Sequence, residues 1–164
     1  PATAHGWIDH LDLDAHPEGG YYRETYRTDA SIPETALPDR FDGPRDVATL
    51  IYFLLPIVSA LHRIRQDEIW HFYAGAAITL HQIAPDGTYT TQTLGRDVTD
   101  GQKLHTVVPA GTWFGATVDA DAGYGLAGCT TAPAFEFDDF ELGDREALTE
   151  AFPQHEGVIE RLTR

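Results

Sequence analysis

The 164-residue sequence predicts an all-β domain, an antiparallel sandwich or barrel with short helices near its two ends. Three observations predict this fold class. Short runs rich in valine, isoleucine, threonine and aromatic residues follow one another along the chain. Turn signals interrupt the runs at intervals of about ten residues. Helix-like spacing of apolar residues is confined to the two ends. A small barrel of this kind can hold one small ligand.

The N-terminal part combines one helix, one strand and one loop. Residues 3–13 predict a short helix that Thr3 caps. A Gly-Gly turn then leads into a strand, YYRETYR, at residues 21–27. Residues 29–46 hold three prolines in a polar stretch and predict a long loop.

The remaining elements follow from the same signals. Two strands flank a Pro-Asp-Gly turn at residues 85–87. The other predicted strands lie at residues 47–55, 60–65, 67–74, 104–108, 123–131 and 134–137. Helices are predicted at residues 144–151 and 155–162. Since no repeat or linker divides the chain, we expect one domain over 1–164, with its barrel at about 20–140 and a helical segment at 144–164.

Charge and composition narrow the choice of partners. The net charge is −15, from 11 basic and 26 acidic residues, so nucleic acid and anionic membrane surfaces are not expected partners. The single cysteine, Cys129, allows no disulfide within the chain. Neither a signal peptide nor a membrane-spanning run is evident. We therefore expect a cytoplasmic protein.

Two spaced motifs carry the chemistry. His62 is followed after one residue by Ile64, then after three by Glu68 and after six by Gly75. Further on, PAG is followed after two residues by Phe114. This spacing resembles the two motifs of the cupin superfamily, with Ile64 and Phe114 where that superfamily usually has histidines.

Five blocks in a fixed order resemble one branch of that superfamily, the cupin-5 family. They are HPEGGYYRETYR, ATLIYFLL, HRIRQDEIWHFYAG, VVPAGTW and GCTTAPAFEFDDFEL. The resemblance implies a double-stranded β-helix, or jelly roll, and a homodimer. It implies no established reaction, and the likeness to sugar-nucleotide epimerases and seed storage proteins is one of fold alone.

The metal prediction follows from the ligand count. The resemblance implies a site of three histidines and one glutamate, but Ile64 and Phe114 have no lone pair to donate. If a metal binds, its ligands are His62 and Glu68, too few for a tight site. His71 does not complete the set, because on a strand it points away from Glu68. We expect no cofactor, or at most a weakly bound divalent metal.

Strand alternation predicts the pocket. The side chains of one face converge on one concave space: His62, Glu68, Trp70, Phe72 and Phe114. In such apolar surroundings an imidazole and a carboxyl group can exchange protons near neutral pH. A purely structural hydrogen bond is the alternative role for His62.

The YYRETYR strand offers a second set of residues. Alternation places Tyr22, Glu24 and Tyr26 on one face, with both arginines on the other. If the first face is inward, Glu24 joins the pocket as a catalytic group and the tyrosines offer hydroxyl groups to a ligand. Alternatively, the strand lies at the surface and its arginines pair with acidic neighbours.

The predicted function is that of a small-molecule-binding cupin. A sugar-like or polar-aromatic metabolite would undergo isomerisation or epimerisation by proton transfer, with His62 as base and Glu68 or Glu24 as partner. A non-catalytic ligand-binding cupin and a metal-dependent oxygenase are the alternatives. The outward face with Ile69, His71 and Tyr73 would be covered by a second subunit.

Overall fold

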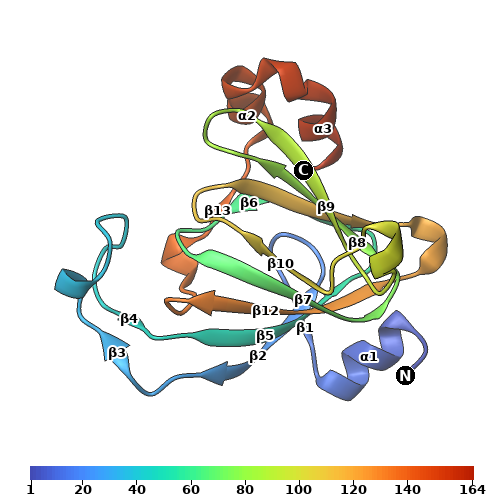
Figure 1. The fold of residues 1–164 in the computed structure, drawn as a ribbon, viewed down its shortest axis with the longest axis horizontal. Helices are drawn as coiled ribbons and strands as arrows, with labels where there is room; N and C mark the ends of the chain where they lie inside the picture. Colours follow the sequence, from blue (N-terminus) through green and yellow to red (C-terminus); the bar gives the residue numbers. More distant parts are fainter.

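Two antiparallel β-sheets packed face to face form the body of the protein (Figure 1). The computed structural model describes residues 1–164, apart from the side chain of Ala120. One sheet has the strand order β1-β2-β5-β12-β7-β10 and the other β13-β6-β11-β8-β9. Short helices lie near both ends of the chain. The predicted all-β jelly roll with flanking helices is confirmed.

The six-stranded sheet contains the longest strands. Its members, in spatial order, are β1 (Asp14–Ala15), β2 (Tyr21–Arg27), β5 (Thr49–Leu55), β12 (Gly125–Ala132), β7 (Asp67–Gly75) and β10 (His105–Val108). The five-stranded sheet consists of β13 (Glu141–Leu142), β6 (Val58–Arg63), β11 (Trp113–Val118), β8 (Ile78–Ile83) and β9 (Tyr89–Leu94).

The helices are short. The α-helices are α1 (Ala4–Leu11), α2 (Arg145–Ala151) and α3 (Glu156–Arg161). The 3₁₀ turns are η1 (Glu34–Ala36), η2 (Val98–Asp100), η3 (Ala120–Ala122), η4 (Phe137–Asp139) and η5 (Pro153–His155). The Thr3 hydroxyl accepts a hydrogen bond from the Gly6 amide at 3.0 Å, so the predicted cap of the first helix is present. In the described part of the chain, none of the helices has the length and apolar character that crossing a membrane requires.

Two segments differ from the sequence-based expectation. The long loop at 29–46 carries a small arm made of η1 and a two-stranded sheet of β3 (Ser31–Ile32) and β4 (Arg45–Asp46), which projects at the left of Figure 1. Residues 134–137 do not form the predicted strand. Pro133 has no amide N–H to continue the ladder, and the Ala134 amide bonds to Asp46 of the arm instead.

The hydrophobic core has three parts. Between the sheets lies a cluster built around Phe53, Trp70, Leu80 and Phe114. The C-terminal helices cover the outer face of the five-stranded sheet with a second cluster that includes Leu148 and Ile159. The first helix covers the outer face of β5 and β12 with a third. The cluster between the sheets leaves one end of that space free for a cavity.

Candidate functional site

A cavity of about 430 Å³ opens between the sheets at the end opposite the aliphatic core. This volume is in the range of small-molecule sites. Four sources contribute its walls: the six-stranded sheet, β6, the segment before β2, and the segment around η4. The lining side chains include Asp14, His16, Glu18, Tyr22, Glu24, Arg27, His62, Ile64, Glu68, Cys129, Phe135, Glu136, Phe137 and Phe140.

His62, on β6, lies 3% exposed beside the cavity. Its Nδ1 lies 2.7 Å from the Ala60 carbonyl oxygen, which accepts only, so Nδ1 carries a proton. Its Nε2 lies 2.5 Å from a carboxylate oxygen of Glu18. Burial acts to lower the pKa of His62, but the Glu18 carboxylate and the Ala60 carbonyl act against it, and the net pKa is raised. The geometry is that of an imidazolium held by an ion pair.

Glu18 reaches His62 because the chain turns sharply after it. Gly19 and Gly20 have φ angles of 99° and 87°, which side chains disfavour. A Cβ atom at Gly20 would lie 2.8 Å from the Leu54 carbonyl oxygen, so the turn packs directly on the sheet. The Glu18 carbonyl accepts a hydrogen bond from the Ala60 amide at 2.8 Å, which ties the turn to β6.

His16 lies beside Glu18 and has a different protonation state from His62. The Glu18 backbone amide donates to His16 Nδ1 at 3.2 Å, so the proton of the neutral ring is on Nε2. Burial is the main cause that lowers the pKa of His16, opposed by the Glu18 carboxylate. The ring of His16 packs edge-on against Tyr22 at 4.7 Å and lies 5.7 Å from Phe140. His16 is therefore a neutral part of the aromatic wall.

Glu68, on β7, is the group of the cavity poised to change its charge near neutral pH. Burial raises the pKa of Glu68 to about 7, and the Glu18 carboxylate adds to the rise. His62 opposes the rise, as do the Cys129 thiol and the Trp70 indole, although the Trp70 N–H does not reach the alignment of a hydrogen bond. The carboxyl oxygens are therefore left to the cavity.

Arg27 closes the rim of the cavity through a saturated set of hydrogen bonds. Its five N–H groups donate to both carboxylate oxygens of Glu24, to Asp46, to Glu136 and to the Phe135 carbonyl, at 2.8–3.1 Å. The side-chain hydrogen bonds to Glu24 are the largest cause that raises the Arg27 pKa. This network joins β2 to the arm and to the segment before η4.

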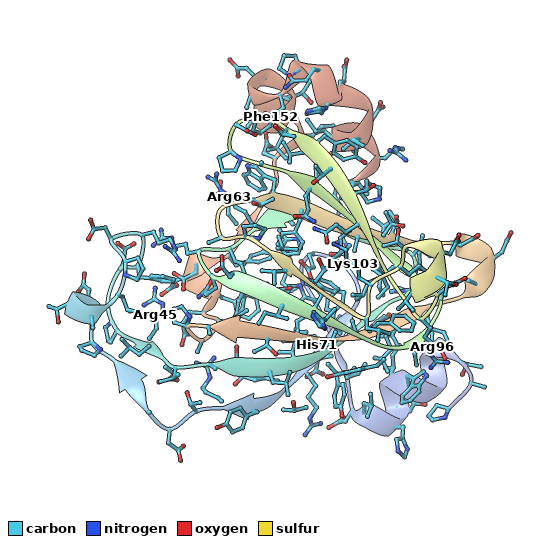
Figure 2. The ribbon with its side chains drawn as sticks, viewed as in Figure 1. Arg45, Arg63, His71, Arg96, Lys103 and Phe152 are labelled. Carbon is cyan, nitrogen blue, oxygen red and sulfur yellow. The ribbon has the colours of Figure 1, made fainter. Side chains whose placement is uncertain are left out.

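A buried latch holds the aromatic segment of the mouth in place. Arg45, a residue of the arm that is labelled in Figure 2, donates to both carboxylate oxygens of Asp139 at 2.8 and 2.7 Å. Asp139 also accepts from the Gln66 amide at 2.7 Å. Because Asp139 lies between Phe137 and Phe140, the latch fixes the two rings at the cavity wall.

The predicted site residues fall into two groups. His62, Glu68, Glu24 and Tyr22 line the cavity. Tyr26 does not, because a bulge shifts the register of β2 between Glu24 and Tyr26. The extra residue reverses the alternation, so Tyr26 is 56% exposed and Arg27 turns to the cavity. The prediction that Tyr26 lies on the same face as Tyr22 and Glu24 was wrong.

The other three predicted ligand-binding residues do not line the cavity. Trp70 and Phe114 are each 1% exposed and pack edge to face at 6.3 Å below the cavity. Phe72 lies further along β7 and packs against the same core cluster. Alternation predicts which residues face the interior but not their depth, so the expectation that these rings line the cavity was wrong. Phe114 still contacts the site, because its ring lies 4.1 Å from that of His62.

Sequence reasoning missed several cavity residues: His16, Glu18, Arg27, Phe135, Phe137 and Phe140. The His-Pro-Glu-Gly-Gly run was a signal for the first two, since a polar pair before two glycines can be turned inward. His71, labelled in Figure 2, lies outside the cavity, where its Nε2 is 3.2 Å from the Thr130 hydroxyl.

The residues of the cavity do not fit the metal site of three histidines and one glutamate. Ile64 lines the wall and Phe114 is buried, and both ring nitrogens of His62 already have partners. Among the described side chains, no group of three or more histidine, cysteine, aspartate or glutamate residues is placed to hold a metal ion.

The two facing sheets, with a ligand-sized cavity at one end and the motif residues His62 and Glu68 in its wall, define a protein of the cupin class. A family model, described as "Cupin superfamily (DUF985)", matches residues 5–143. The chain belongs to this family.

Relatives of the whole chain have no established activity in their descriptions. Protein SO0799 from Shewanella oneidensis is 39% identical, with a TM-score of 0.88 over 99% of this chain and 98% of that one. A hypothetical protein from Leishmania major is 37% identical, with a TM-score of 0.90 over 98% of both chains. The uncharacterized protein YML079W of Saccharomyces cerevisiae is 26% identical over 150 residues, 85% of this chain and 74% of its own length.

A more distant likeness concerns the fold alone. Oxalate decarboxylase from Bacillus subtilis shares 14% identity and a TM-score of 0.54 over 93% of this chain, which corresponds to 37% of the decarboxylase. At this identity the likeness supports the shared cupin architecture and carries no chemistry.

Proposed function

We propose that this cupin binds a small molecule in its cavity and moves a proton on it, as an isomerase-type enzyme with Glu68 as the acid–base group. One observation carries the proposal. A buried carboxyl group with a pKa of about 7 faces a partly aromatic cavity that opens at one end. A general base works best when its pKa is near the working pH.

The structure supports a different division of roles from the one predicted from sequence. His62 was expected to be the base, but its ring nitrogens are held by Ala60 and Glu18. We assign His62 to position Glu18 and to supply fixed positive charge beside Glu68. Glu24 is bound to Arg27 at the rim and has no free oxygen to act as the partner base.

The proposed step needs only one mobile group. The Glu68 carboxylate removes the proton from a hydroxyl-bearing carbon next to a carbonyl group, and the electron pair of the C–H bond moves into an enediolate. The same carboxyl group then returns the proton to the former carbonyl carbon, while the hydroxyl proton passes to the former carbonyl oxygen. An epimerisation would need a second proton carrier on the opposite side of the substrate. Since His16 is neutral and its Nδ1 accepts from the Glu18 amide, a one-base isomerisation fits better.

Simple ligand binding is the second candidate function. The observation that favours it is the saturation of the rim: Arg27, Glu24 and Glu136 form a fixed network, which gives the cavity a rigid wall and leaves none of these groups free to move a proton. The metal-dependent oxygenase alternative has no supporting ligand set in the described residues.

The test begins with a metabolite screen by thermal stabilisation and continues with deuterium incorporation from solvent into any ligand found. We expect incorporation by the wild type and a loss of about 10²–10⁴-fold in rate for Glu68→Gln. Glu141→Gln is the matched control, because Glu141 pairs with Arg63 outside the cavity and should exchange at the wild-type rate. If the wild type binds a screened metabolite but incorporates no deuterium into it, the isomerase proposal is contradicted and the binding role remains.

We also propose that the protein works as a homodimer. The outer face of β7 and β10 carries exposed apolar side chains, Tyr73 at 40% and Val107 at 45%, and β10 is an edge strand of its sheet. Exposed edges and apolar faces are usually covered. Light scattering should give twice the chain mass at micromolar concentration, and Val107→Lys should shift it toward the monomer. A monomer mass for the wild type would contradict the proposal.

A further inference from the structure

We infer that the ligand of the cavity is a small organic cation, an ammonium group carried on a flat apolar body. The inference rests on the proposed function, because it names the chemical class of the molecule bound there. It follows from the charge of the walls, from which charges are already neutralised, and from the aromatic mouth.

Acidic groups outnumber cations in the cavity wall. Five carboxylic side chains line it: Asp14, Glu18, Glu24, Glu68 and Glu136. The cations of the wall are Arg23, Arg27 and the His62 imidazolium. The remaining histidine, His16, is neutral because burial lowers its pKa. A ligand that enters this space therefore meets net negative charge.

The cations of the wall have little capacity left for an anion. Every N–H group of Arg27 donates to a carboxylate or to the Phe135 carbonyl. Both N–H groups of His62 face oxygen atoms of the protein. Arg23 donates to Asp12 through Nη1 alone and keeps its other N–H groups, but its side chain is 47% exposed to water. A carboxylate or phosphate beside Glu68 would therefore have to displace existing ion pairs to reach Arg27 or His62.

Among the acceptors of the cavity, in contrast, Glu68 lacks a strong donor. Glu18 is 4% exposed and has the His62 imidazolium as its charged partner at 2.5 Å. Glu68 is 9% exposed and has only the weakly donating thiol of Cys129 and the misaligned indole of Trp70 nearby. Buried carboxylates without donors are costly, and an ammonium group supplies three N–H donors together with the opposite charge.

The aromatic mouth supports the same class of ligand. The rings of Phe135, Phe137 and Phe140 lie 5.0–6.5 Å from one another at the cavity wall. Aromatic faces attract cations, most strongly where water is excluded, and they also stack on flat apolar groups. One end of the ligand thus meets carboxylates and the other meets rings.

Three probes of equal size and different charge test the inference: benzylamine, benzyl alcohol and benzoate, titrated calorimetrically into the wild type at pH 8. We expect benzylamine to bind at least about tenfold more tightly than either of the others, because a single close charge contact is worth that much. Its affinity should rise from pH 6 to pH 8 as Glu68 ionises, whereas that of benzyl alcohol should stay constant.

Two variants test whether Glu68 causes the tighter, pH-dependent binding of benzylamine. Glu68→Gln should remove the pH dependence of benzylamine binding and lower its affinity about tenfold at pH 8. Glu141→Gln, outside the cavity, should bind as the wild type does. Circular dichroism of both variants confirms that a loss of binding is not a loss of fold.

The outcomes separate the inference from the proposed function. If benzoate or benzyl alcohol binds as tightly as benzylamine, the inference of a cationic ligand is overturned, whereas small-molecule binding stands. If none of the three binds at millimolar concentration, the inference is overturned as well. Proton transfer by Glu68 is then judged by the deuterium experiment with the screened metabolites, which uses none of these probes.

Discussion

The two ends of the space between the sheets share several strands but differ in chemistry. At the closed end, Leu55, Ile78 and Leu80 are 0% exposed and pack as an ordinary aliphatic core. At the open end, the strands carry polar and charged side chains into the cavity, with Glu68 on β7 and His62 on β6. Strand β7 runs from Glu68 at the cavity to Phe72, which packs against the core cluster.

The difference shows how the fold separates stability from chemistry. Each buried aliphatic side chain of the closed end contributes about 1.5–3 kcal/mol by leaving water. The polar end stabilises the fold less, because buried charges lose their hydration and their ion-pair partners compensate for only part of that loss. Variants at the two ends should therefore differ in how their free energy of unfolding depends on pH. They should also differ in how strongly it is coupled to substitutions at neighbouring residues.

The largest effect is expected where a buried charge loses its partner. His62→Ala leaves the Glu18 carboxyl group 4% exposed and unpaired, which should lower the free energy of unfolding by about 3–5 kcal/mol. The Phe114 ring, 4.1 Å from that of His62, loses a packing partner in the same variant. Urea unfolding at pH 7 measures the change.

A double-mutant cycle separates the pair from the lost volume. Glu18→Gln combined with His62→Ala should cost less than the sum of the single variants, because no buried charge is left. Leu80→Ala, at the closed end, should lose about 2–5 kcal/mol and add to Glu18→Gln without coupling. Strict additivity for Glu18 and His62 would show that the ion pair does not stabilise this end of the fold.

A smaller effect is expected at Glu68, and with the opposite sign. Its pKa is raised from 4.5 to about 7 by burial and by Glu18. Below pH 4.5 the group is protonated in both states. Between pH 4.5 and 7 the unfolded chain releases a proton that the folded chain keeps, so stability falls as pH rises, by on the order of 1–3 kcal/mol.

Glu68→Gln lacks this titration, so it should be the more stable protein above pH 7 by that amount, and the advantage should shrink toward pH 4.5. Chemical unfolding from pH 4 to pH 9 measures it, with Glu141→Gln as the control that follows the wild-type curve. A difference that does not change with pH would mean that Glu68 does not titrate in this range, and would weaken its role as the acid–base group.

Local sequence signals predicted much of the fold, because many of its elements depend only on residues that are neighbours in the sequence. The Thr3 cap and the Pro-Asp-Gly turn of the β8–β9 hairpin depend on a few neighbouring residues. The cavity depends on contacts between distant segments. Glu18 meets His62 only because a turn packs across β6, and nothing near residue 18 in the sequence encodes that partner. The motif spacing predicted His62 and Glu68, but their partners required the structure.

The bulge in β2 is the clearest case of a feature that strand alternation cannot predict. It is also the basis of the smallest expected effect, that of substituting Tyr26. Tyr26 is 56% exposed on the outer side of the sheet, whereas Tyr22 lines the cavity. Tyr26→Ala should therefore change the free energy of unfolding by at most about 0.5 kcal/mol, as surface substitutions usually do. It should leave benzylamine binding unchanged. Tyr22→Ala should weaken that binding, because it removes the ring that packs against His16 at 4.7 Å. Calorimetry on the two variants measures the contrast. Equal losses of binding in the two variants would show that Tyr26 contacts the ligand, and would contradict the conclusion that the bulge turns Tyr26 away from the cavity.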